Sequence, residues 1–202
     1  MNKRALHHML VGLRQLRVRE LTILFVALVL IGAFFLRQNN LHMITLRNRV
    51  LQADEQNKDI PKALANLHNY VVAHMNASMG DQGIYLEHSY HRSYAAAITA
   101  AAQGGSDSAV IYQNAEKVCK AQFDPDAAFL SYAQCAVAKV AASGAPPIST
   151  PSADLYRFNF VAPAWSPDLA GFTLLTAVLV GILLVGQMVL RAVLYTVLRA
   201  NR

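Results

Sequence analysis

Two histidines and a glutamate form the set of side chains in this sequence best suited to metal chemistry. His88 and His91 stand three residues apart beside Glu87. Residues at this spacing share one face of a helix, and two imidazoles with a carboxylate can bind zinc. However, the HExxH and CxxC spacings of established zinc motifs are absent. We therefore predict no metal site, and expect His88, His91 and Glu87 to make polar surface or interhelical contacts.

Other catalytic chemistry has even less support. The sequence has no GxSxG motif for a serine nucleophile. Residues 80–83 carry two glycines, but they lack the further glycine and the Lys-Ser/Thr pair of a phosphate-binding loop. Asp124 and Asp126 are explained by helix capping. We therefore expect a protein that is not an enzyme and that binds no cofactor.

Both cysteines, Cys119 and Cys135, lie in the central part of the chain. We expect a disulfide between them, and the alternative is two buried thiols. If they lie on neighbouring antiparallel helices joined around Phe123 and Asp124, they are at unequal distances from the turn. Because the two Cα atoms of a disulfide lie within about 7 Å, the bridge then requires crossed helices or an irregular start to the second helix.

The composition indicates a membrane protein. Hydrophobic residues make up 54% of the 202 residues and charged residues only 15%, whereas soluble domains carry about 25% charged residues. Two runs are free of charge, residues 21–36 and 169–190, and a helix of about 20 apolar residues crosses a bilayer. The alternative for either run is a buried core helix. A cleaved signal peptide is a further alternative for the first, but residues 34–37 (FFLR) are not a small-x-small cleavage site. We expect an uncleaved signal anchor.

The charges predict the orientation of these spans. Residues 1–36 and 191–202 together carry eight Lys and Arg against one acidic residue, a net charge of +7. Residues 37–168 carry ten basic and eleven acidic residues, a net charge of −1. Since basic segments stay on the cytoplasmic side, we predict that both termini are cytoplasmic and that residues 37–168 are extracytoplasmic. An oxidising compartment would permit the disulfide. The excess positive charge, which makes the isoelectric point high, lies in the two terminal segments. It therefore gives no support for nucleic-acid binding.

A heptad-like seam comes directly after the first span. It predicts that the membrane helix continues outward as a stalk, with apolar or Asn side chains on one face. Its positions are Leu36, Asn39, Met43, Leu46, Val50, Ala53, Asn57 and Ile60. We call Met43, Leu46, Val50, Ala53 and Asn57 the stalk seam. It could pair with another copy, with a partner protein or with a later helix of the same chain. Buried Asn can fix register and oligomeric state, which favours association between chains.

Four further helices are expected before the second span. They cover residues 61–76, about 85 or 90 to 103, 106 or 107 to 122, and 124–143. The third of them should bury Val110, Ile111, Ala115 and Val118, and the fourth should begin at Asp124-Pro125. Five prolines then predict a non-helical strap over residues 145–168. Within it, residues 155–160 could form a short strand or pack their aromatic rings on the helices.

The predicted fold is all-α: an extracytoplasmic domain of four to five helices between two transmembrane helices. The segments are a basic amphipathic tail (1–20), the first span (21–36), the stalk (37–60), the helical domain (61–144), the strap (145–168), the second span (169–190) and a basic tail (191–202).

The stalk and the helix after it resemble two-span membrane proteins of reduced-genome bacteria of the Saccharibacteria type. The similarity is carried by residues 36–41 (LRQNNL), 43–47 (MITLR), 63–64, 70–71 and 74–76, with Val50 and Asp54. It covers about the first half of the chain, and it implies a bacterial plasma membrane but no activity. The architecture is also similar to four-helix-bundle sensor receptors. It departs from them after Arg191, where eleven residues leave no room for a signalling module.

Two functions therefore compete. The first is a non-enzymatic plasma-membrane protein whose helical domain binds other envelope proteins, or copies of itself, as a scaffold or assembly factor. The alternative is an accessory subunit that senses a ligand and acts through a separate cytoplasmic partner. An exposed apolar stalk seam would favour the first, and a polar pocket would favour the second. The expected partners are the lipid bilayer and other membrane proteins, not nucleic acid.

Overall fold

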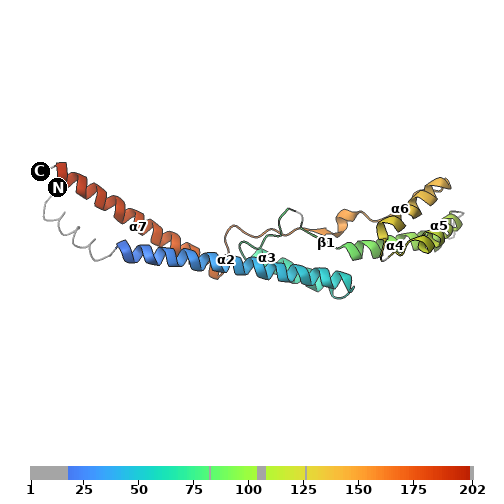
Figure 1. The fold of residues 1–202 in the computed structure, drawn as a ribbon, viewed down its shortest axis with the longest axis horizontal. Helices are drawn as coiled ribbons and strands as arrows, with labels where there is room; N and C mark the ends of the chain where they lie inside the picture. Colours follow the sequence, from blue (N-terminus) through green and yellow to red (C-terminus); the bar gives the residue numbers. More distant parts are fainter. Residues whose placement is uncertain (1–17, 82, 104–107, 126, 201–202) are drawn as a thin grey trace. The chain divides into compact units, whose positions relative to one another are not determined.

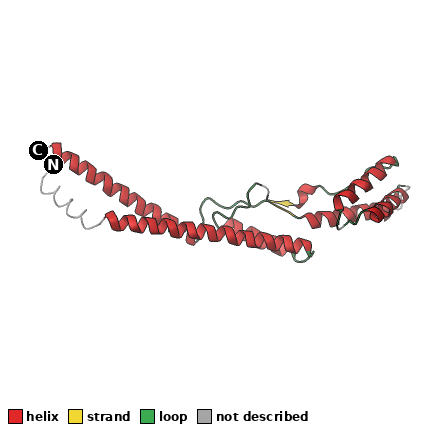
Figure 2. Cartoon of the chain, viewed as in Figure 1, coloured by secondary structure: helices red, strands yellow, loops and turns green. Residues whose placement is uncertain are grey.

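The computed structural model describes residues 18–81, 83–103, 108–125 and 127–200, and helix predominates among them (Figures 1 and 2). The elements in chain order are α2 (Val18–Glu55), α3 (Ile60–Ala73), β1 (Ile84–Tyr85), α4 (Glu87–Gln103), α5 (Ala109–Gln122), α6 (Phe129–Ala142), the 3₁₀ turn η1 (Ala153–Tyr156), β2 (Arg157–Phe158) and α7 (Leu169–Ala200). The predicted all-α class is confirmed, with one pair of two-residue strands added.

Helices α2 and α7 are long and apolar enough to cross a membrane. The most apolar stretches of the two helices have mean hydropathies of 2.2 and 2.4. Helix α2 is continuous from the apolar run into the predicted stalk, but it ends at Glu55, before the expected boundary at residue 60. Helix α7 starts at Leu169 as predicted and continues beyond residue 190.

The chain divides into two compact units. The hairpin unit contains, among the described residues, 18–44, 68–78 and 161–200, and the bundle unit contains those within 45–67 and 79–160. Helices α2 and α3 contribute to both units. Each unit has its own set of packed side chains.

Glycines bring α2 and α7 close together in the hairpin unit. A Cβ atom on Gly32 would lie 2.7 Å from Leu174 Cδ2, and one on Gly181 would lie 3.1 Å from Phe25 Cε2. Each glycine therefore receives a large side chain of the opposite helix. Phe25 precedes Gly32 by seven residues, and Leu174 precedes Gly181 by seven, so the contacts repeat at heptad spacing along an antiparallel pair. Such small-residue contacts are typical of helices packed in membranes.

The bundle unit has a core formed by α4, α5 and α6. The buried side chains of this core are Tyr94, Ile98, Cys119, Phe129, Tyr132, Ala133 and Ala136. A smaller cluster of Ala102, Tyr112, Ala115 and Val140 continues the contact toward the other end of α5. Four alanines lie among these residues, so the helices approach closely around the aromatic rings of Tyr94, Tyr112, Phe129 and Tyr132.

Helix α5 buries a different face from the one expected. Its buried residues are Ala109, Tyr112, Ala115 and Cys119. Of the four residues predicted to be buried, only Ala115 is; Val110 is 69% exposed. With Ile111 and Val118, Val110 lines a surface groove of about 260 Å³. The buried face is rotated by about one residue from the predicted one. Tyr112 and Cys119 are seven residues apart and both point inward, where Cys119 is bonded to Cys135 of α6.

Helix α6 begins at Phe129, so the predicted start at Asp124-Pro125 was wrong. Phe123 has an extended backbone, with φ −135° and ψ 126°, and it ends α5. Ala128, the residue before α6, has φ −134° and provides no side-chain cap. The turn before α6 is therefore longer than the Asp-Pro signal indicated.

The strap between α6 and α7 contains more local structure than predicted. Residues 153–156 form one 3₁₀ turn, which corrects the expectation of no helix. Both alternatives for residues 155–160 are realised: Phe158 of β2 pairs with Ile84 of β1, and the Tyr156 ring contacts Tyr90 at 5.6 Å. Gly83, at φ +60°, precedes β1, and a Cβ there would lie 2.3 Å from the Phe158 carbonyl oxygen. Only glycine fits at this position.

Several predictions lie outside the described residues. They concern the amphipathic tail up to residue 17, the helix boundaries at Gly104, Gly105, Ser106 and Asp107, the capping role of Asp126, and residues 201 and 202.

Candidate interaction surface and the buried polar junctions

The histidine pair lies on α4 in the bundle unit, where it makes interhelical and local contacts. His91 Nε2 is 3.7 Å from Glu87 Oε1, and the His91 ring stacks on Phe129 of α6 at 3.6 Å between centroids. Burial lowers the pKa of His91, although Glu87 partly opposes this shift. The His88 and His91 rings meet edge to face at 6.3 Å. Within the described part of the chain, no three His, Cys, Asp or Glu side chains are grouped to hold a metal ion.

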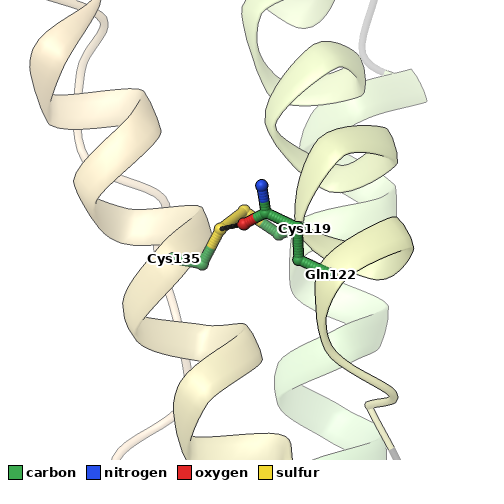
Figure 3. Close-up of a disulfide and its surroundings, with 3 residues drawn as sticks. All are labelled: Cys119, Gln122 and Cys135. Atoms are coloured by element: carbon green, nitrogen blue, oxygen red, sulfur yellow. Dashed lines mark hydrogen bonds between the residues drawn. A yellow bond between two sulfur atoms is a disulfide. The ribbon is translucent and has the colours of Figure 1, made fainter.

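The disulfide between Cys119 and Cys135 is present, with the Cα atoms 5.8 Å apart. Figure 3 shows it linking α5 to α6, with Gln122 beside it; Gln122 Oε1 lies 4.0 Å from Cys135 Sγ. Cys119 is three residues before the end of α5, and Cys135 is six residues after the start of α6. The non-helical residues before α6 delay the start of this helix, so that Cys119 and Cys135 lie opposite each other. This is the irregular start to the second helix, one of the two geometries expected from the sequence.

Most of the stalk seam is buried within the single chain. Met43, Leu46 and Val50 are 5%, 8% and 0% exposed, and Ala53 is half-buried. Asn57 is not on the helix: it is exposed in the turn after α2, with φ 52°. Asn tolerates this left-handed conformation better than most residues. The seam is therefore core in this structure, and it is not available as the interaction surface that the heptad pattern suggested.

Helix α3 folds back along α2 and explains this burial. The turn between them is closed by hydrogen bonds from Asn57 N to the Asp54 carbonyl and from Lys58 N to the Ala53 carbonyl. Leu67 and Val71 of α3 are fully buried. In the hairpin unit the His42 and Tyr70 rings are 4.5 Å apart. An antiparallel pair joined by four residues thus covers the seam.

Asp54 forms a buried polar junction in the bundle unit that the sequence did not reveal as a site. It is 1% exposed and joins the last turn of α2 to the first turn of α4. Its carboxylate accepts hydrogen bonds from His88 N at 3.0 Å, Ser89 N at 2.8 Å and Ser89 Oγ at 2.5 Å. The first amides of a helix have no partner within the helix, and here Asp54 supplies one from another element.

Arg92 neutralises this buried carboxylate. Its Nη2 lies 3.3 Å from Asp54 Oδ1, and its Nη1 donates to the Asp54 carbonyl oxygen at 3.0 Å. The guanidinium also donates to Ser89 Oγ at 2.9 Å. Ser89 and Arg92 are three residues apart and therefore share one helix face, but only the fold shows that Asp54 is their partner.

A second polar junction lies in the hairpin unit beside the start of α7. Asn39 Nδ2 donates to Asp168 Oδ2 at 2.6 Å and to the Met75 carbonyl at 3.2 Å. Met75 N donates to Ser166 Oγ at 2.8 Å, and Gly171 N donates to Asp168 Oδ1 at 2.8 Å. Burial acts to raise the pKa of Asp168, but hydrogen bonds from Gly171, Asn39 and Ser166 outweigh it and lower that pKa. Asn39 thus has its partners within the chain.

Beside Asp54 is an open cavity of about 380 Å³. It lies between the last turns of α2 and the start of α4. Its walls are Asn48, Leu51, Gln52, Asp54, Glu55, Tyr85, Glu87 and His88. The lining is polar and acidic, and the Asp54 carboxylate in it is already bonded to α4.

The outward side of α6 is an exposed apolar surface of the bundle unit. Leu130 and Val137 are 69% and 51% exposed, and Gln134, Ala138 and Ala141 beside them are exposed as well. We call these five residues the α6 outer face. The opposite side of α6 is the buried core side, with Tyr132, Ala133, Ala136 and Val140. Lys139 is the one charged residue of this helix, and Gln134 is the one polar residue of the α6 outer face.

No family model matches this chain, and no curated protein or solved structure matches it either.

Proposed function

We propose that this is a two-span bacterial plasma-membrane protein that acts as a protein-binding scaffold or assembly factor in the cell envelope, without catalysis. The observation that carries the proposal is the α6 outer face. Exposed apolar side chains that follow one another along a helix are typical of interaction sites. On α6, only the inner side has a covering element in the described chain. A partner protein would cover the other side.

The proposed topology rests on the charge distribution and the disulfide. Helices α2 and α7 cross the membrane, both termini are cytoplasmic, and the bundle unit is extracytoplasmic. The net charges of +7 on the ends and −1 between them support this orientation. A disulfide persists in an oxidising compartment and is rare in the cytosol. Labelling intact cells with a membrane-impermeant thiol reagent tests it: Ser149→Cys should react and Asn201→Cys should not, and the reverse pattern would refute it.

Photo-crosslinking tests the interaction surface. A photoreactive amino acid is placed at Leu130 or Val137 in the full-length protein in cells, and at exposed Lys117 of α5 as the control. We expect discrete protein adducts from both α6 positions and none above background from Lys117. A non-reducing gel confirms that each variant retains its disulfide. Equal, diffuse labelling from all three positions would refute an interaction surface on α6.

The cavity beside Asp54 favours a second candidate function, that of a ligand-sensing accessory subunit. A molecule bound there would touch both α2 and α4, and α2 continues as one helix into the apolar run. Its motion could therefore reach a cytoplasmic partner. The acidic lining suits a small amine. Saturation-transfer NMR with the full-length protein and a panel of amines tests this function: a signal lost in Gln52→Trp, which fills the cavity, would support it.

A further inference from the structure

We propose that the lipid headgroup layer on the extracytoplasmic side lies at the start of α7, and that Trp165 and the end of α3 are held in this layer. The bilayer is then contacted by the strap and by α3 as well as by the two spans. This inference rests on the proposed topology, because it places a membrane surface along α2 and α7. It is carried by helix register, by the position of the indole and by the hydrogen bonds of the segment after α3.

The two charge-free runs end at the same level within the hairpin unit. The glycine contacts between α2 and α7 set their antiparallel register. In this register Arg37, the first charged residue after the run in α2, lies opposite Leu169, with which the run in α7 begins. The hydrogen bond from Asn39 to Asp168, at 2.6 Å, joins the two helices just beyond this level. Because charged side chains are costly in hydrocarbon, this common level marks the edge of the hydrocarbon core.

Trp165 lies at this level because the chain turns sharply before α7. A Cβ atom on Gly171 would collide with the Ser166 carbonyl oxygen and would lie 3.1 Å from Trp165 Nε1, so the indole lies against the first turn of α7. Its ring meets the Phe172 ring edge to face at 6.1 Å between centroids, yet Trp165 is 50% exposed. An indole that packs on an apolar helix and keeps half of its surface exposed is suited to the headgroup region.

The segment after α3 reaches the same level. Asn76 Nδ2 donates to the carbonyl oxygen of Leu36, the last residue of the charge-free run in α2, at 3.1 Å. Met75 N donates to Ser166 Oγ at 2.8 Å, and Ser166 is the residue next to Trp165. The end of α3 therefore lies beside the edge of the hydrocarbon core and level with the indole.

Side chains of the protein pair the backbone groups of this segment. Besides the bond from Met75 N to the strap, the Met75 carbonyl accepts from Asn39 Nδ2 at 3.2 Å. The Asn76 carbonyl accepts from Asn40 Nδ2 at 3.4 Å. Polar backbone groups close to hydrocarbon are costly unless they are paired within the protein. The segment after α3 is thus suited to a place where water is scarce.

The exposed side chains around this level fit lipid. The exposed apolar face of α7 continues from Phe172 through Leu175 and Leu179, so a surface that meets hydrocarbon along the span is continuous with the one beside Trp165. Arg37 is exposed at the same level, and its guanidinium can bind lipid phosphate. The nearby carboxylate of Asp168 accepts hydrogen bonds within the chain.

Fluorescence quenching by labelled lipids tests the inference, because Trp165 is the one tryptophan of the chain. The full-length protein is reconstituted in vesicles of phosphatidylethanolamine and phosphatidylglycerol that carry a nitroxide at the headgroup or at the middle of the acyl chain. We expect the headgroup label to quench Trp165 about threefold more strongly than the chain label, as for an indole at headgroup depth. Ala73→Trp with Trp165→Phe should give the same order, because Ala73 is exposed at the end of α3.

Two matched variants with Trp165→Phe bracket this depth, both at exposed positions of the hairpin unit. Leu179→Trp lies about 15 Å along α7 from Leu169, and the chain label should quench it more strongly than the headgroup label. Ile44→Trp lies about 10 Å beyond Arg37 along α2, and both labels should quench it weakly. Circular dichroism checks that each variant keeps its helix content.

Each other outcome overturns the inference in a distinct way. If the chain label quenches Trp165 more strongly, or neither label does, the headgroup layer is not at the start of α7; quenching of Leu179→Trp by the chain label would still retain the two spans. No quenching of Leu179→Trp would refute the proposed topology as well. Quenching of Trp165 by the headgroup label without quenching of Ala73→Trp would refute the contact of α3 with lipid.

Discussion

The stalk seam on α2 and the outer face of α6 are both apolar helical stripes with the same three- and four-residue spacing. On α2 the stripe is covered, and Val50 is fully buried. On α6 it is not, and Leu130 is 69% exposed. The difference lies in the connection at the end of each helix. A four-residue turn returns α3 antiparallel to α2, whereas the residues after α6 enter a proline-rich strap. Helical periodicity identifies an apolar face, but the next connection decides whether the chain covers it.

The polar residues of the two helices differ in the same way. Asn39 of α2 donates to Asp168 and to the Met75 carbonyl, so its amide is used within the hairpin unit. Gln134 of α6 lies exposed on the outer face. The asparagine that suggested association between chains therefore fixes packing within one chain, and the corresponding α6 amide remains available to a partner.

The largest expected effect is at Asp54, which follows Ala53 of the covered stripe. Asp54→Ala leaves the Arg92 charge without its partner and removes the acceptor of three hydrogen bonds at the start of α4. We expect a loss of about 3–5 kcal/mol in the free energy of unfolding, because three hydrogen bonds to a buried carboxylate are lost. Urea unfolding of the full-length protein in detergent measures it. The neighbouring exposed Glu55→Ala is the control and should change stability by less than about 0.5 kcal/mol.

Removing the disulfide should have the next largest effect on the free energy of unfolding. The bond holds α6, the helix whose outer face is exposed. The bridge closes a loop with a sequence separation of 16 residues, for which chain-entropy arguments give about 3 kcal/mol. We expect the double variant Cys119→Ala, Cys135→Ala to lose that amount. A reducing agent should destabilise the wild type by a similar amount and leave the double variant unchanged. Reductant sensitivity in the double variant would show that the effect does not come from this bond.

The two stripes can be compared directly by truncating one residue on each. Val50→Ala removes two buried methyl groups and should cost about 2 kcal/mol. Leu130→Ala removes more atoms but from an exposed site, and it should change stability by less than about 0.5 kcal/mol. Unfolding in detergent measures both variants. A comparable loss for Leu130→Ala would mean that the α6 outer face is packed within the chain, and the comparison would fail.

The elements of this fold could be predicted from the sequence where local signals decide them. Charge-free runs predicted α2 and α7, and alanine-rich and proline signals placed α3 and α4 within a few residues. The start of α6 could not be predicted, because Asp124-Pro125 is a good local start that the chain does not use. The buried face of α5 was also missed, since Val110 and Tyr112 differ little in pattern and the disulfide position decides between them.

The candidate sites were less predictable because they depend on contacts between distant segments. The pairing of Cys119 with Cys135 could be predicted, since the chain has only these two cysteines. The Asp54 junction joins residues 34 to 38 positions apart, and no local pattern marks Asp54 as different from Glu55. The Asn39 and Asp168 contact spans 129 positions. The open face of α6 became visible only when its neighbours were placed.

The smallest expected effect is a pH dependence from His91, which stacks on Phe129 at the start of α6. Burial lowers the pKa of His91 below 6.5 in the folded protein, so the unfolded chain takes up a proton first as the pH falls. Stability should therefore decline below about pH 6.5 until the folded pKa is reached. His91→Gln should flatten the stability profile between pH 7 and 5.

A matched control for His91 is Asp168→Asn, which acts in a different range. The pKa of Asp168 is lowered from 3.8 by its hydrogen bonds, so its contribution is fully present above that value. It is lost only as the pH falls through the lower folded pKa. Asp168→Asn should therefore reduce stability uniformly between pH 7 and 5 without changing the slope, because it removes a partner of Asn39. If His91→Gln also shifts the stability profile without flattening it, the His91 imidazole is not the group that titrates. The contact between His91 and Phe129 then does not make stability depend on pH.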